Sequence, residues 1–229
     1  MKNILSILLL AFVFVSCEND VKTNTPAFQG EKDNLFWRAG DSRVTVNSNG
    51  TITLNGYTDY EVISVTVPNA VGTYDLGTAN NSNFASYSYN NEGTVLYYET
   101  SYQEGPANKI YRVNGGSGYA SLDGSIVQTI GGNGNGLNLK LTVASNGVVS
   151  DAKITARGIG YLPGDIVTAV GGNNNATFRV VNTTLSNGEV EIEKIENGTY
   201  TGNIKFNASD DNGNIVNFNN GKFYKVPVY

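Results

Sequence analysis

Short runs in which apolar and polar residues alternate, separated by Asn-Gly pairs, recur along most of this 229-residue chain. One example is "RVTVNSNGTITL" (43–54), where Val44 and Val46 share one face and Asn49-Gly50 follows. An Asn-Gly pair suits the tight turn of a β-hairpin, because both central residues of a type I′ turn need a positive φ. Alternation with a period of two indicates strands with one buried face. The pattern therefore predicts a chain built from antiparallel hairpins.

The composition agrees with this prediction. Charged residues make up only 15% of the chain, and glycine occurs 27 times. The Ala-, Leu-, Glu- and Lys-rich mixture of long helices is missing, whereas Val, Ile, Thr, Tyr and Phe, which suit a pleated surface, fill the runs between turns. We expect an all-β protein whose main domain is an antiparallel β-sandwich or barrel, and the sequence leaves these two alternatives open.

The N-terminal residues predict where the protein is sent. Lys2 precedes an apolar run over 4–15, which is too short for a membrane-spanning helix and typical of a signal peptide. The run ends in Ser16-Cys17, which resembles the lipobox of bacterial lipoproteins. Cleavage would remove residues 1–16, acylation would attach lipid to Cys17, and residues 17–26 would form a lipidated tether.

This interpretation places the protein in the cell envelope, lipid-anchored to the outer membrane on its periplasmic or surface-exposed face. Glu18 and Asp20 resemble the acidic tract that directs such lipoproteins to the cell surface. The alternative is a secretory signal with an incidental cysteine. Cys17 is the only cysteine, and a thiol without a disulfide partner is a liability in an oxidising compartment, which favours lipidation.

The centre of the chain contains an internal repeat. Each copy has a leading run ("KIYRV" and "AKITA"), Gly-x-Gly-Tyr, a Val/Ile run, Gly-Gly-Asn and a second alternating run. Tyr119 matches Tyr161, 42 residues later, and Gly131 matches Gly171, 40 residues later. A repeat unit buries its apolar face only against a neighbour, so the copies should form one module. Residues 186–204 are either a partial third copy or an ordinary hairpin of the main domain.

Both parts of the chain resemble known families. The flanks resemble an uncharacterised, Bacteroidetes-type family of small all-β lipoproteins, and the centre resembles the GGSGY-type β repeats of phage virion and bacterial surface proteins. The flanking resemblance is carried by "AFQGEKDNLFWRA" (27–39), "TITLNGY" (51–57), "GTYDLG" (72–77), "NGTYTGNIKFNA" (197–208) and "NFNNGKFYKVPV" (217–228). Together they imply a discontinuous host β domain (27–103 and 186–229) with a non-catalytic repeat module inserted over 104–185.

The chain lacks the residues that most catalytic mechanisms require. The chain has no His, which excludes Ser-His-Asp and Cys-His nucleophiles and the usual zinc sites. The glycine-rich stretches lead into strands and lack the Gly-Lys-Ser/Thr ending of a phosphate loop. A formal charge of −5 disfavours binding to the negatively charged backbone of nucleic acid. We therefore expect no enzymatic activity, cofactor, metal ion or nucleic-acid partner.

Two polar clusters are candidate sites. Glu189, Glu191 and Glu193 alternate along one strand face. We interpret them as a solvated face rather than as paired carboxylates for glycoside hydrolysis. Residues 209–214 ("SDDNGN") carry oxygen atoms that suit Ca²⁺, but they lack the EF-hand loop, which favours a turn.

Aromatic residues cluster between 84 and 111. Tyr87 and Tyr89 share a strand face and could stack on sugars or contact a protein partner, although core and cross-strand tyrosine pairs are the favoured interpretation. Trp37, Tyr119 and Tyr161 are likewise expected to pack in cores. The cluster consists of Phe84, Tyr87, Tyr89, Tyr97, Tyr98, Tyr102 and Tyr111.

The sequence therefore predicts a lipid-anchored cell-envelope protein with a structural, adhesive or display role. The alternative is a surface lipoprotein that binds carbohydrate or a small ligand through Tyr-lined loops. The expected partners are the membrane, through the lipid, and a surface glycan or protein. No binding residue can be assigned.

Overall fold

The computed structural model describes residues 26–229. The expected signal peptide (1–16), the lipidation site Cys17 and nearly all of the tether (17–26) lie outside the described residues. Within them the chain forms seventeen strands, β1 to β17, and one 3₁₀ turn, Ala120–Leu122, with no α-helix. Every pair of neighbouring strands is antiparallel. The all-β, antiparallel prediction is confirmed.

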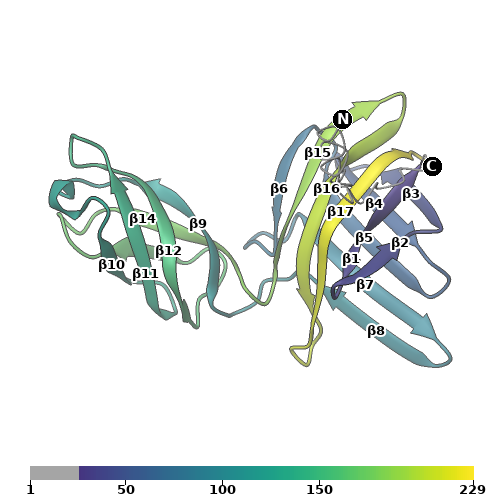
Figure 1. Ribbon diagram of the computed structural model, residues 1–229, viewed down its shortest axis with the longest axis horizontal. Coiled ribbons are helices and arrows are strands. Elements are labelled where there is room, and N and C mark those ends of the chain that lie inside the picture. The colour runs from purple at the N-terminus through teal and green to yellow at the C-terminus, as the bar shows by residue number, and fades with distance from the viewer. Residues whose placement is uncertain (1–25) are drawn as a thin grey trace, which may run out of the picture.

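Eleven strands form the sheet of the host domain, which curves into a half-barrel (Figure 1). Its order is β2-β1-β17-β16-β8-β7-β5-β4-β3, and β15 pairs with both β16 and β6. The bounds are β1 (Ala27–Lys32), β2 (Leu35–Arg38), β3 (Asp41–Val46), β4 (Thr51–Tyr57), β5 (Glu61–Pro68), β6 (Gly72–Leu76), β7 (Phe84–Asn91), β8 (Thr94–Glu99), β15 (Asn187–Glu196), β16 (Thr199–Ser209) and β17 (Ile215–Pro227).

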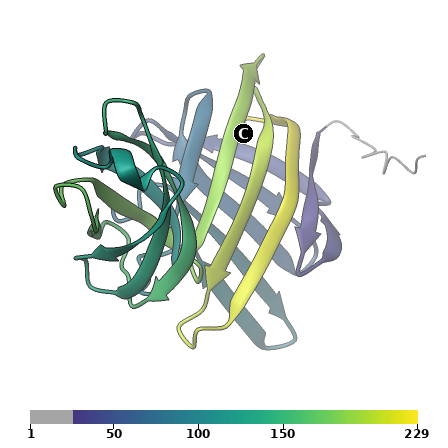
Figure 2. The same ribbon diagram turned by 60° about the vertical axis from the view of Figure 1, so that its left-hand side comes forward.

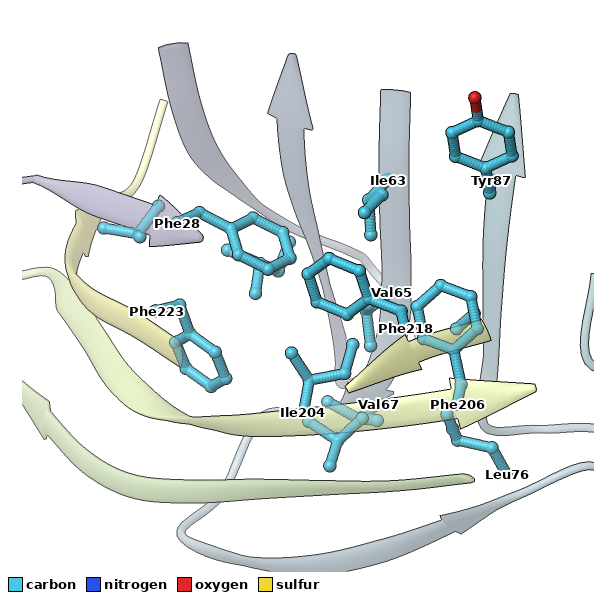
Figure 3. Close-up of a cluster of buried hydrophobic side chains, with 14 of the residues drawn as sticks. Phe28, Ile63, Val65, Val67, Leu76, Tyr87, Ile204, Phe206, Phe218 and Phe223 are labelled. Atoms are coloured by element: carbon cyan, nitrogen blue, oxygen red, sulfur yellow. The ribbon is translucent and has the colours of Figure 1, made fainter. Parts of the chain in front are cut away.

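Aromatic side chains fill the inside of the half-barrel (Figure 3). The ring of Phe218 lies 5.6 Å from that of Trp37 and 5.5 Å from that of Phe206, measured between centroids. Phe28 packs edge-on against Phe218 at 6.1 Å. The expected core position of Trp37 is confirmed. These residues come from both ends of the described chain, so the host core closes only when β16 and β17 join β1 and β2.

The other six strands form the repeat module, a nearly closed barrel shown in front in Figure 2. Its order is β12-β11-β10-β13-β14-β9. The bounds are β9 (Ala107–Asn114), β10 (Ile126–Ile130), β11 (Asn135–Val143), β12 (Val149–Ile159), β13 (Ile166–Ala169) and β14 (Thr177–Thr183). A separate apolar core that includes Leu137, Leu139 and Phe178 fills this barrel.

The two copies of the repeat exchange strands. Strands β9 to β11 come from the first copy and β12 to β14 from the second, yet β9 pairs with β14 and β12 pairs with β11. At the centre, β10 pairs with β13, and Thr129 lies opposite Ala169, its match 40 residues later. The copies are therefore related by a local two-fold axis, and neither completes its sheet alone.

The repeated tyrosines reinforce this exchange. Tyr119 Oη donates to the carbonyl of Ala169 (2.9 Å) and accepts from the amides of Asn175 and Ala176 (3.1 Å each). Tyr161 Oη accepts from the amide of Leu137 (3.3 Å). Both tyrosines are fully buried, so the expected packing role is confirmed. Each hydroxyl holds the beginning of the last strand of the other copy.

The glycines of the Gly-x-Gly-Tyr motifs are needed for backbone shape. Gly116 and Gly158 have φ values of +60° and +61°, and Gly118 and Gly160 have +80° and +76°. These lie in the left-handed region that glycine adopts at little cost. The motif therefore makes a turn that places the following tyrosine in the core, in agreement with the interpretation as turn glycines.

The module leaves the host after β8 and returns at β15. Ser101 N–H donates to Ser186 Oγ (2.7 Å), and Ser186 Oγ donates to the carbonyl of Ser101 (2.7 Å), so the two connections run side by side. The expected boundaries at 103/104 and 185/186 fall in these connections and stay predictions. Residues 187–196 lie in β15 and residues 199–204 in β16, and Val190 and Ile192 join the host core.

Candidate functional site

Tyr87 belongs to a half-buried polar network at the rim of the host core. Its hydroxyl donates to Glu61 Oε1 (2.8 Å), and Trp37 Nε1 donates to Glu61 Oε2 (2.9 Å). Lys32 Nζ lies 3.4 Å from Glu61 Oε1 and 4.9 Å from the centroid of the Tyr87 ring. Burial and the bond to Glu61 raise the pKa of Tyr87. The phenol therefore stays protonated and supports the carboxylate.

Because of this network, the ring of Tyr87 is not accessible as a stacking surface for sugars. The residue is only 4% exposed, and its ring lies 6.0 Å from that of Tyr98, its cross-strand partner in β8. Tyr89 is half-buried and packs against the same core. The interpretation as core and cross-strand tyrosines is confirmed for this pair. The exposed members of the aromatic cluster are Tyr97, Tyr102 and Tyr111.

The three glutamates of β15 share the outer face of the host sheet, because Val190 and Ile192 between them point into the core. Asn203 Nδ2 donates to Glu191 Oε2 (3.2 Å) and to Glu193 Oε1 (2.6 Å). The expected common face is confirmed, and Glu191 and Glu193 are exposed to solvent.

Glu189 differs from the other two because it is half-buried between two lysines. Its carboxylate lies 3.4 Å from Lys109 Nζ, which belongs to the module, and 3.4 Å from Lys205 Nζ. Burial acts to raise the pKa of Glu189, but the two ammonium groups outweigh it and the pKa is lowered. A general acid for glycoside hydrolysis needs a raised pKa, so Glu189 does not fit that role.

Two adjoining hollows, of about 320 and 290 Å³, meet at Glu189 and Lys205 and form what we call the junction groove. The first hollow crosses β15 to β17, and the second reaches the module. The side chains beyond the shared pair are Glu191, Asn203, Asn220 and Lys222 in the first, and Asp75, Asn108, Lys109, Asn182 and Asn187 in the second. Carboxylates, amides and ammonium groups thus line both hollows.

The same groups fasten the module to the host. Lys109 Nζ donates to Asp75 Oδ1 (2.7 Å), and Asn182 Nδ2 donates to the carbonyl of Leu76 (3.0 Å). Within the module, Asn108 Nδ2 donates to Asn182 Oδ1 (3.1 Å). This groove was not predicted from the sequence, because its residues come from six strands (β6, β9, β14, β15, β16 and β17) that no motif links. The only signal was the alternation of the glutamates along β15.

The "SDDNGN" segment is a turn, as expected. Asp210 Oδ1 accepts from the amides of Asn212 (2.9 Å) and Asn214 (2.8 Å), so its carboxylate is used to close the turn. In residues 26–229, no group of three or more Asp, Glu, His or Cys side chains is arranged to hold a metal ion. No helix long and apolar enough to span a membrane occurs in the same part of the chain.

Comparison with known proteins gives one family. The sequence profile of a domain of unknown function, DUF6252, matches the chain twice, over residues 24–132 and 107–227. The first match runs from the host into the module, and the second runs from the module back into the host. No curated protein and no solved structure matches significantly.

Proposed function

The chain belongs to the DUF6252 family of domains of unknown function, and we propose that this member is a lipid-anchored cell-envelope protein with a structural, adhesive or display role. The signal-like N-terminus and Ser16-Cys17 support lipid attachment at Cys17 and an outer-membrane location. The resemblance to Bacteroidetes-type lipoproteins and to GGSGY-type surface repeats supports the same role. No catalytic step is part of this proposal.

The position of the module is the observation that carries the proposal. Strand β1, which follows the tether, lies in the host domain, and the module forms the opposite end of the molecule in both views (Figures 1 and 2). The bonds of Lys109 and Asn182 to the host hold it there. A lipid at Cys17 would therefore leave the module directed away from the membrane.

Replacing Cys17 with alanine should abolish lipid attachment. In cells fed an alkyne analogue of palmitate, we expect the unaltered protein to be labelled and Cys17→Ala to show complete loss of label, because the thiol is the acylated atom. Ser16→Ala, which keeps a small residue before the cysteine, is the matched control and should stay labelled. Persistent labelling of Cys17→Ala would contradict lipid attachment at this residue. Surface display is tested separately by adding protease to intact cells, and a module that resists cleavage there would contradict it.

The junction groove favours a second candidate function, the binding of a neutral polysaccharide. Its amides supply donors and acceptors together, which suits the hydroxyl groups of a sugar. Its charged groups are largely paired, as in Lys109 with Asp75 and Glu189, so a charged ligand would have to break these pairs. This version of the carbohydrate alternative uses the groove in place of Tyr-lined loops.

A glycan array probed with the purified protein tests this second function. If the groove binds sugar, Asn203→Ala should weaken binding about tenfold, because it removes an amide that lines the groove and donates to Glu191 of the same groove. Asn90→Ala, an exposed asparagine on β7, is the matched control and should bind as the unaltered protein does. Equal binding by both variants would exclude the groove as the sugar-binding site.

A further inference from the structure

Strand β8 (Thr94–Glu99) leaves most of one backbone edge open. On one side it pairs with β7 along its whole length. On the other side only Glu99 is paired, opposite Ser209 of β16. Thr94, Val95 and Tyr97 are exposed, and Val95 is 69% and Tyr97 52% accessible. Figure 1 shows the β7–β8 hairpin at the border of the host domain.

The hairpin register shows which backbone groups face this open edge. The turn at Glu92-Gly93 has φ values of +50° and +85°, as in a two-residue type I′ turn, so Asn91 and Thr94 form its hydrogen-bonded closing pair. Hydrogen-bonded positions then alternate along the strand. Thr94, Leu96 and Tyr98 bond to β7, whereas the N–H and C=O groups of Val95 and Tyr97 point away from it. The bond from Thr100 N–H to the carbonyl of Ala85 (2.9 Å) fits this alternation.

Each of the other long edges of the host sheet is met at one residue by another segment of the described chain. On β3, the carbonyl of Val44 accepts from the amide of Tyr229 (2.9 Å). On β6, the carbonyl of Leu76 accepts from Asn182 Nδ2 (3.0 Å). Strand β2 is only four residues long. Proteins normally protect an edge with lysine, proline, a bulge or a covering segment. The sequence "TVLYYE" of β8 has no Lys or Pro, and in residues 26–229 no strand pairs with this edge beyond Glu99.

We propose that β8 is a docking site for an extended, basic segment of a protein partner, which adds to the sheet as a further strand. Main-chain bonds to Val95 and Tyr97 would provide affinity, and apolar side chains on one face of the partner would cover the exposed side chains of the same two residues. Glu92 and Glu99 bound the open edge. The inference goes beyond the display role and does not depend on a lipid anchor.

Charge complementarity selects a basic partner over a second copy of β8. The predicted host segments, 27–103 and 186–229, contain 7 basic and 14 acidic residues, a net charge of −7. Two copies of β8 paired edge to edge would bring Glu92 and Glu99 of one chain towards those of the other, and like charges across strands are destabilising. A lysine-bearing strand would meet opposite charge instead.

The test uses a fluorescein-labelled peptide, KVTVKVTVK, whose valines share one face of an extended strand. Fluorescence anisotropy should show saturable binding to the purified protein, weakened about tenfold by Tyr97→Pro, which removes an outward-facing N–H. Tyr97→Thr is the matched control, because threonine keeps the backbone N–H and the preference for strands. Its loss of peptide affinity should be smaller than that of Tyr97→Pro. The peptide with glutamate in place of lysine should bind about tenfold more weakly.

Hydrogen exchange gives a readout that needs no variant. On peptide binding, the amides of Val95 and Tyr97 should become protected, whereas those of Leu96 and Tyr98 are already protected by β7. Unchanged exchange at Val95 and Tyr97, or equal peptide affinity of Tyr97→Pro and Tyr97→Thr, would overturn the proposal. So would a concentration-dependent dimer that Tyr97→Pro abolishes, because the occupant would then be a second copy.

Discussion

Replacing Tyr119 with alanine should lower the free energy of unfolding of the repeat module by about 3–5 kcal/mol, the usual cost of emptying a buried aromatic site. The ring is fully buried, and three backbone groups would lose their hydroxyl partner. A Cβ at Gly172 would lie 2.7 Å from the Tyr119 ring, so backbone packs directly against it. The loss should therefore spread to the exchanged strands.

Hydrogen exchange resolved by segment measures this effect. Amides of β9 to β14 should exchange faster in Tyr119→Ala, while those of β4, β5 and β16 keep their protection, because the two cores share no buried residue. Tyr119→Phe is the matched control. It keeps the ring and loses only hydroxyl bonds, at about 1–3 kcal/mol. A module that keeps its protection in Tyr119→Ala would contradict the account of strand exchange.

Replacing Phe218 with alanine should have a comparable effect on the host, about 3–5 kcal/mol. This side chain is 0% exposed and contacts three other aromatic rings, those of Phe28, Trp37 and Phe206. Removing it leaves a cavity where the two ends of the described chain meet. Denaturant unfolding followed by the fluorescence of Trp37, the only tryptophan, reports on this core directly.

The matched control for Phe218→Ala is Phe36→Ala. Phe36 is 71% exposed on β2, so its loss should change stability by no more than about 0.5 kcal/mol. Host amides should lose protection in Phe218→Ala, and module amides should retain it. If the module loses protection to the same degree, the two cores unfold as one cooperative unit, and the insertion has become part of a single folding domain.

Local signals were enough to predict the hairpins. Val44 and Val46 pair with Leu54 and Ile52, as the alternation predicted. The expected type I′ turn is wrong, because only Gly50 of the Asn49-Gly50 pair has a positive φ (+81°). Asn-Gly turn chemistry acts within four residues, and a period of two sets which face of a strand is buried. Such information is present in any short window of the chain.

The candidate sites depended on contacts that no such window contains. Tyr87 and Tyr89 have the same spacing whether they face solvent or a core, and only the bonds of Tyr87 to Glu61 and the packing of Tyr98 decide between the two. The junction groove depends on Lys109 reaching Asp75 and Glu189, residues 34 and 80 positions away. Electrostatic partners at such separations leave no periodic signal.

The sequence by itself determined that this protein is all-β, that its middle is a duplicated unit and that the glycines of the Gly-x-Gly-Tyr motifs make turns, because strand alternation and positive-φ turns are local properties. Only the tertiary structure decided that the two copies exchange strands about Thr129 and Ala169. It also decided that the backbone of Val95 and Tyr97 is left open at the edge of the host. Strand order joins segments that the sequence leaves free to pair in many ways, and burial of two separate cores selects among them.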